Sequence, residues 1–135
     1  MPQNEHAPRS FLLGTDWWTD CDDAVAIRML ARAAKRKEIH LLGIGINACM
    51  PFSVASLDGF LATEGLRSVP LGLDRDATDF GGRPPYQERL APYAVDYRSN
   101  DDAEDAVRLY RTILAAASKI SRPRSAHRRI LSSLQ

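Results

Sequence analysis

Four aspartates crowd one short segment of the chain, GTDWWTDCDDAVAI, which covers residues 14–27. They stand between an apolar run and a segment with helical spacing, at Asp16, Asp20, Asp22 and Asp23. Hard divalent cations such as calcium and magnesium bind oxygen ligands, often several carboxylates at once. Without a cation, repulsion between neighbouring carboxylates would raise the pKa of some of them. The pattern therefore favours a metal site in which one acid remains for acid–base work or for binding hydroxyl groups.

Capping at the start of a helix is the alternative explanation for a single aspartate of this kind. The helix dipole and the first free N–H groups both favour a carboxylate there. Four acids between residues 16 and 23 are more than capping requires. Trp17 and Trp18 stand in the same loop, where they either wall a pocket and stack on a flat ring or cover the edge of a sheet.

Strand and helix patterns alternate around this loop. Apolar runs predict short buried strands, and apolar residues that recur every three or four positions predict helices. The strands are expected at 10–15, 39–48 and 69–73, and the helices at 24–37 and 53–66. This alternation predicts an α/β domain with a Rossmann-like parallel sheet and flanking helices. In such sheets ligand sites form beyond the carboxyl ends of the strands, which is where the aspartates stand.

The second half of the chain has a weaker pattern. Residues 74–102 are rich in Gly, Pro and Asp and show no clear period, so we expect a long loop that is functional or mobile. A helix is predicted over 102–119, with Asp101 or Asp102 as its cap.

These patterns give one α/β domain over residues 10–118. We expect a disordered lead-in at 1–9 and an irregular basic tail at 119–135, which carries several arginines. A sheet of three or four strands leaves an edge and an apolar face uncovered. The chain is therefore expected to form a homo-oligomer or to need a partner that supplies further strands.

Composition and charge exclude several classes of protein. With 135 residues and a net charge of +1, the chain suits one small domain and favours neither nucleic acid nor an anionic membrane as a partner. No apolar run approaches the roughly 20 residues that span a bilayer. The first ten residues carry no signal-peptide pattern, and two cysteines make no disulfide framework. We therefore expect a cytoplasmic protein that binds neither nucleic acid nor membranes.

The segment TDWWTDCDDAVAIRML resembles the opening motif of the inosine–uridine-preferring nucleoside hydrolase family. That family begins with a strand, then Asp-Thr-Asp-Pro-Gly-x-Asp-Asp-Ala, then a helix. LLGIGINA at 41–48 and VPLGLDRD at 69–76 are similar to the family's next two strands. The resemblance covers about residues 10–118. It implies the N-terminal portion of a nucleoside hydrolase fold, which would be incomplete and apparently truncated in this chain.

The resemblance also implies a calcium site and gives roles to three aspartates. Asp16 would bind the calcium ion and take the proton from the attacking water, which makes it the catalytic residue. Asp23 would be a second metal ligand, and Asp22 would hold hydroxyl groups of the ribose.

Further residues would complete this implied site. Asn47 stands near the place of the family's sugar-binding asparagine, and Trp17 or Trp18 would pack against the base of the substrate. Gly14 occupies the place of the family's first aspartate. Asp20 has no counterpart in the family's shorter loop, so we expect it to add a metal ligand or a contact with substrate.

The implied reaction is hydrolysis of the N-glycosidic bond of a ribonucleoside, to ribose and free base, by a calcium-bound water. Asp16 and Asp23 supply only part of the six to eight oxygens that calcium takes, so weak metal binding and little activity are expected of this chain. A non-catalytic α/β domain that binds a riboside or a protein partner is the alternative. A metal-dependent phosphatase is disfavoured, because no Lys or Arg lies between residues 10 and 27 to neutralise phosphoryl oxygens.

Overall fold

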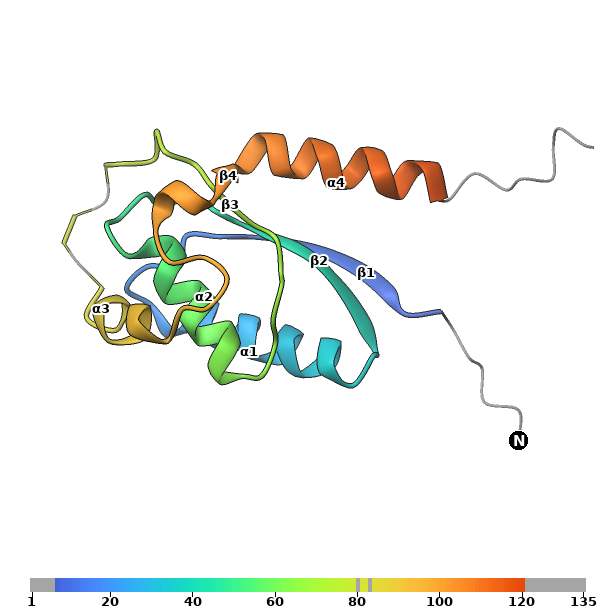
Figure 1. Ribbon diagram of the computed structural model, residues 1–135, viewed down its shortest axis with the longest axis horizontal. Helices are drawn as coiled ribbons and strands as arrows, with labels where there is room; N and C mark the ends of the chain where they lie inside the picture. Colours follow the sequence, from blue (N-terminus) through green and yellow to red (C-terminus); the bar gives the residue numbers. More distant parts are fainter. Residues whose placement is uncertain (1–6, 80, 83, 121–135) are drawn as a thin grey trace, which may run out of the picture.

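Parallel strands form the centre of the domain in the computed structural model, which describes residues 7–79, 81–82 and 84–120 (Figure 1). Within these residues the sheet has four strands, all parallel and side by side in sequence order. They are β1 (Arg9–Thr15), β2 (Ile39–Ile46), β3 (Leu71–Leu73) and β4 (Glu104–Asp105). The predicted α/β class and parallel sheet are confirmed, and the three strands expected from apolar runs are β1, β2 and β3.

Helices cover both faces of the sheet. Two helices, α1 (Cys21–Lys35) and α2 (Ser53–Thr63), lie on one face, and α4 (Ala106–Ile120) lies on the other (Figure 1). The helices predicted over 24–37 and 53–66 are thus confirmed as α1 and α2, with slightly different ends. The core lies mainly between the sheet and the first two helices, where Ile27, Ile44 and Leu57 are fully buried.

Glycines of the strands lie under α4 and let this helix approach the sheet closely. A Cβ on Gly43 would lie 2.7 Å from Cδ1 of Ile113, and a Cβ on Gly72 would lie 2.9 Å from Cα of Ala106. Any larger residue at these two positions would push α4 away from the sheet. The same glycines that punctuate the apolar runs in the sequence therefore set the distance between α4 and the strands.

The long segment between β3 and β4 packs against α2. It contains a single helical turn, α3 (Gln87–Leu90), and two 3-10 turns, η1 (Ala91–Tyr93) and η2 (Asn100–Asp102). As a result α2 has neighbours on two sides, and its residues from Ser53 to Gly59 are all buried. The predicted absence of a period in residues 74–102 reflects this irregular layer.

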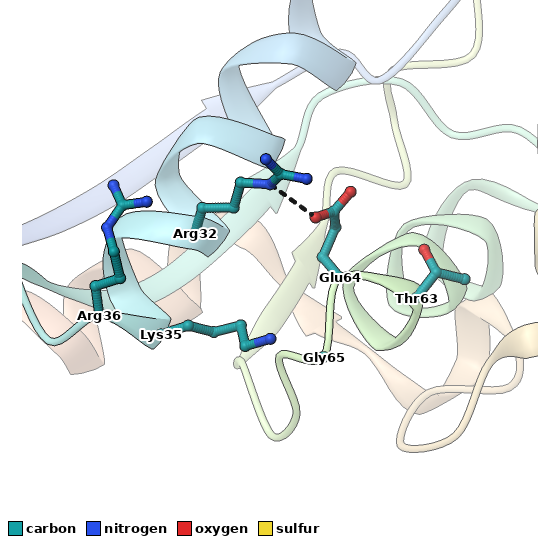
Figure 2. Close-up of a pocket in the computed structure, with 6 residues that line it drawn as sticks. All are labelled: Arg32, Lys35, Arg36, Thr63, Glu64 and Gly65. Atoms are coloured by element: carbon teal, nitrogen blue, oxygen red, sulfur yellow. Dashed lines mark hydrogen bonds and ion pairs between the residues drawn. The ribbon is translucent and has the colours of Figure 1, made fainter.

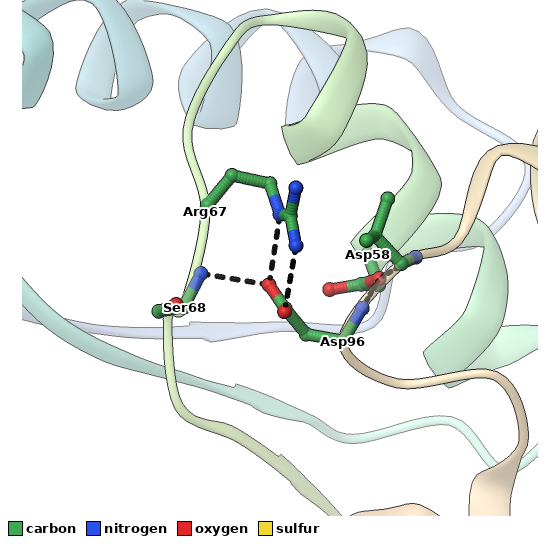
Figure 3. A network of polar contacts seen from close by, with 5 residues as sticks. Asp58, Arg67, Ser68 and Asp96 are labelled. Atoms are coloured by element: carbon green, nitrogen blue, oxygen red, sulfur yellow. Dashed lines mark hydrogen bonds and ion pairs between the residues drawn. The ribbon is translucent and has the colours of Figure 1, made fainter.

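Two aspartates fix this layer to the middle of α2 and to the segment that follows the helix. A carboxylate oxygen of the buried Asp58 accepts the N–H groups of Val95 (2.7 Å) and Asp96 (2.9 Å). The Asp96 carboxylate in turn accepts two hydrogen bonds from Arg67 and one from the Ser68 N–H (Figure 3). The Arg67 guanidinium and the Ser68 N–H hold the pKa of Asp96 below its ordinary value. This network replaces the regular hydrogen bonds that the irregular segment cannot make.

The start of α4 corrects one prediction. Residues 104–105 are extended and pair with β3, so the helix begins at Ala106 rather than at 102. The carboxylate of Asp105 accepts the N–H of Arg108 (3.0 Å), and Asp102 instead accepts the N–H of Ser99 (3.1 Å), which precedes η2. Asp101 and Asp102 therefore do not cap α4, because pairing with the sheet extends the chain beyond them before the helix starts.

The ends of the chain and its surface complete the fold. Residues 1–6 and 121–135 lie outside the described residues, so the predicted lead-in and basic tail are mostly not observed. Within the described residues, β1 pairs only with β2 and leaves its other edge open. None of the helices in the described ranges combines the length and the apolar character that crossing a membrane demands. Cys21 and Cys49 are both free thiols.

We expect Gly59→Ala, in the middle of α2, to lower the free energy of unfolding by about 1–3 kcal/mol. Alanine favours a helix by about 1 kcal/mol over glycine, but here its Cβ would collide with the main-chain oxygen of Leu90 and lie 3.2 Å from the Ala94 nitrogen. Urea denaturation measures the change. Gly81→Ala is the matched control, since its Cβ would have nothing within 4 Å, and a stabilised Gly59→Ala chain would contradict the packing of α2 described here.

Candidate functional site

Polar residues follow the ends of three neighbouring strands at one edge of the sheet. The N–H of Asn47, after β2, donates to the carbonyl of Thr15 at the end of β1 (2.8 Å). The N–H of Asp74, after β3, donates to the carbonyl of Ile46 at the end of β2 (2.9 Å). These bonds bring Asn47, which was named from the family resemblance, beside the aspartate loop.

Asp16 and Asp23 interact directly, through a hydrogen bond between their carboxyl groups. Burial and a hydrogen bond with Asp16 raise the pKa of Asp23, and the negative charge of Asp16 adds to this rise. The Thr15 hydroxyl opposes it by donating to Oδ1 of Asp23 (2.9 Å). Two carboxylates that share a site in this way repel each other when both are ionised, so a cation between them would be favourable.

Trp17 fixes the backbone of this loop through every polar group that it has. Its N–H donates to Oγ1 of Thr15 (3.0 Å), and its indole nitrogen donates to Oγ of Ser56 in α2 (2.8 Å). Its carbonyl accepts a hydrogen bond from the side-chain amide of Gln87 in α3 (2.8 Å). The residue has a positive φ of 49°, a left-handed conformation that costs a non-glycine residue about 1–2 kcal/mol. The three bonds hold the chain in this turn directly after Asp16.

The ring of Trp17 is fully buried. Its centroid lies 5.3 Å from that of Phe60 and 5.2 Å from that of Tyr86, the latter in an edge-to-face arrangement. Trp17 is thus a core residue that packs on α2 and on the segment before α3, and it also lines an apolar cavity beside the loop. Its predicted contact with a base stays a prediction, which would require the ring to become exposed.

Tyr86 is a residue of the site that the sequence did not indicate. Its hydroxyl donates to the carbonyl of Trp18 in the aspartate loop. Burial raises the pKa of Tyr86, and the negative charges of the aspartates raise it further, Asp23 first and then Asp16, Asp20 and Asp22. All four carboxylates therefore act on one phenol. The only local signal was an aromatic residue after two prolines in an otherwise polar segment.

Asp20 and Asp22 lie further into solvent than the Asp16–Asp23 pair. Asp20 is exposed and directly precedes α1, and Asp22 is exposed in the first turn of that helix. Among the described residues, no three His, Cys, Asp or Glu side chains gather closely enough to hold a metal ion by themselves. The roles predicted for Asp20 as a metal ligand and for Asp22 as a ribose contact stay predictions, as does the base contact of the half-buried Trp18.

An apolar cavity of about 460 Å³ adjoins the aspartate loop on the side of α1 and α2. Its walls are mainly aromatic and aliphatic, and Asp20, Cys21 and Arg89 also line it. Arg89 comes from α3, so the structure places a cation near the loop that the local sequence lacks. The absence of Lys and Arg between residues 10 and 27 is therefore a weaker objection to an anionic ligand than the sequence indicated.

A second cavity of about 460 Å³ is lined by basic residues at the opposite ends of α1 and α2 (Figure 2). Arg32 and Lys35 extend from α1 toward Glu64 at the end of α2, and Arg36 also lines the cavity. Glu64 is paired with Arg28 (3.0 Å) and with Arg32 (3.5 Å). Because the aspartate loop lies at the start of α1, this cavity is not part of the candidate site.

The resemblance to the nucleoside hydrolases rests on the sequence motif alone. The chain matches no protein-family profile, no curated protein and no solved structure. The site residues named from the motif are therefore the starting point of a proposal.

We expect Asp16→Asn to stabilise the metal-free chain at neutral pH, because it removes the charge that opposes ionisation of Asp23. The gain should stay below about 1 kcal/mol, since solvent screens the pair. Folding raises the pKa of Asp23 above its ordinary 3.8, so the folded chain binds that proton more tightly than the unfolded chain does. The folded chain therefore loses stability as the pH rises through the raised pKa of Asp23. The extra stability of Asp16→Asn over the unaltered chain vanishes below pH 3.8.

Urea denaturation of both chains from acid to neutral pH measures this advantage. A difference in stability that stays the same at every pH would contradict the repulsion between Asp16 and Asp23.

Trp17→Phe should lower the free energy of unfolding by about 1–3 kcal/mol, because it removes a buried hydrogen bond and leaves a gap beside Phe60. Thermal or urea unfolding followed by far-UV circular dichroism gives the change. An unaltered midpoint would mean that the loop does not depend on the contact between Trp17 and Ser56.

Proposed function

We propose that this chain is a nucleoside hydrolase-like domain that binds calcium and a ribonucleoside at the carboxyl edge of its sheet, and that N-glycosidic hydrolysis is the associated reaction. The observation that carries the proposal is the contact between Asp16, directly after β1, and Asp23, in the first turn of α1. The motif resemblance gives the pair its chemistry.

The donor atoms of the pair fit calcium in kind. Carboxylate oxygens are the ligands that this hard cation prefers, and a positive charge would relieve the repulsion between Asp16 and Asp23. Two carboxylates supply fewer than the six to eight oxygens that calcium takes, so water or ligand oxygens must complete the shell. A dissociation constant for calcium of about 0.1–1 mM or weaker is therefore expected.

The residues of the chain divide the remaining work. Asp16 accepts the proton of the attacking water, and Thr15 orients Asp23 through its hydroxyl. Asp22 and Asn47 hold hydroxyl groups of the ribose. Calcium, when bound, supplies positive charge that polarises a water molecule.

A non-catalytic riboside-binding domain is the second candidate, and the position of His40 favours it. Departure of a nucleobase is helped by a general acid, commonly a histidine. His40, the single histidine within the described residues, is exposed in the amino-terminal half of β2, away from the aspartate loop. The described residues thus favour binding over rapid turnover.

Calorimetric titration with calcium and then with inosine tests the proposal. We expect inosine to bind only when calcium is present, with little release of free hypoxanthine over hours. Asp16→Asn should abolish the calcium-dependent binding, since it removes one of the two carboxylates.

Glu38→Gln is the control, because Glu38 is an exposed acid before β2 at the other end of the sheet, where it pairs with Arg36. It should bind calcium and inosine as the unaltered chain does. Failure of the unaltered chain to bind inosine in calcium would contradict the proposed function, and rapid release of hypoxanthine would contradict the preference for binding over turnover.

A further inference from the structure

Tyr110 reaches from α4 across the sheet to the carboxyl ends of β1 and β2. Gly14 of β1 and Gly45 of β2 lie opposite each other in the register, one residue before both strands end. A Cβ on Gly45 would collide with the hydroxyl and ring of Tyr110, and a Cβ on Gly14 would lie 3.2 Å from the same hydroxyl. The two glycines therefore make the room in which this phenol lies.

The side chain of Asn47 points to the same place. Its amide nitrogen lies 3.6 Å from the position that a Cβ on Gly14 would take. The Tyr110 hydroxyl and the Asn47 amide thus approach one point from α4 and from the end of β2. Gly14 and Asn47 are both exposed, so the space above Gly14 is open to solvent.

Tyr110 is equipped to donate a hydrogen bond in this space. Burial raises the pKa of the Tyr110 hydroxyl, so the group keeps its proton at neutral pH. No hydrogen bond from any residue in the described ranges occupies this hydroxyl. The hydroxyl end of the ring lies over Gly45 and near Gly14, so the hydroxyl rather than a flat ring face borders the open space.

We propose that the Tyr110 hydroxyl and the Asn47 amide together bind a sugar hydroxyl of the ribonucleoside in the space above Gly14, which makes Tyr110 a specificity-determining residue. Both groups are neutral and directional, which suits a hydroxyl better than a phosphate or a metal ion. Asp16 follows Gly14 by two residues, so a sugar held here lies near one member of the acid pair. This inference rests on the proposed function.

The decisive experiment is a cycle that combines Tyr110→Phe with removal of a sugar hydroxyl. In calcium, the affinities of both chains are measured for inosine, 2′-deoxyinosine and 3′-deoxyinosine. Tyr110→Phe should weaken inosine binding about three- to tenfold, the effect of one lost hydrogen bond. For the deoxynucleoside that lacks the contacted hydroxyl, the two chains should bind with equal affinity. A merely structural role of Tyr110 would weaken all three ligands alike.

Two further variants distinguish a direct contact of Tyr110 with the ligand from a general effect on folding. Tyr93→Phe is the matched control, because Tyr93 is an exposed tyrosine on η1, and it should leave all three affinities unchanged. Gly45→Ala should weaken inosine binding as Tyr110→Phe does, since the added methyl displaces the phenol, and far-UV circular dichroism checks that this chain is folded.

The outcomes distinguish the two proposals. No binding of inosine by the unaltered chain would overturn the proposed function and the role of Tyr110 with it. Binding that Tyr110→Phe leaves unchanged, or weakens equally for all three nucleosides, would overturn the role of Tyr110 alone.

Discussion

The burial of Trp17 is the constraint on which the candidate site depends. The residue lies directly after Asp16, and its main chain and indole are hydrogen-bonded to β1, α2 and α3 at once. Its left-handed conformation would be unfavourable without these bonds, so the surrounding packing enforces the turn. The acids next to Trp17 are held where α1 begins, although most of their surroundings are solvent. A buried aromatic residue thus gives a polar loop a defined shape.

Local sequence patterns correctly predicted the elements whose structure depends on residues close together in the sequence. The apolar runs of β1 and β2 and the helical spacing of α1 and α2 were sufficient, since each of these elements buries one face or both against the sheet. The start of α4 was predicted wrongly, because pairing of Glu104 with β3 competes with helix formation. The packing of Asp58 against residues 95–96 joins parts of the chain that have no common pattern, so the sequence alone offered no sign of it.

The site was predictable in part for the same reason. Asp16 and Asn47 follow the ends of the adjacent strands β1 and β2, and Asp23 lies in the first turn of α1, so parallel topology brings them to one edge. Tyr86 and Gln87 approach the loop only because the irregular segment folds back over α2. Tyr110 lies within the last helix, and its hydroxyl meets the strand ends only because two glycines let α4 lie close. This close approach depends on glycines, which have no side chain, and a pattern of apolar residues does not predict it.

The open side of β1 has a consequence for how the sheet could grow. Main-chain N–H and C=O groups alternate in direction along a strand, so one set in β1 bonds with β2 while the opposite set has no strand to meet within the described residues. A further strand could join there without disturbing any existing pair, and its end would emerge next to Asp16. A strand added at the open edge of β1 would therefore place new residues beside the aspartates.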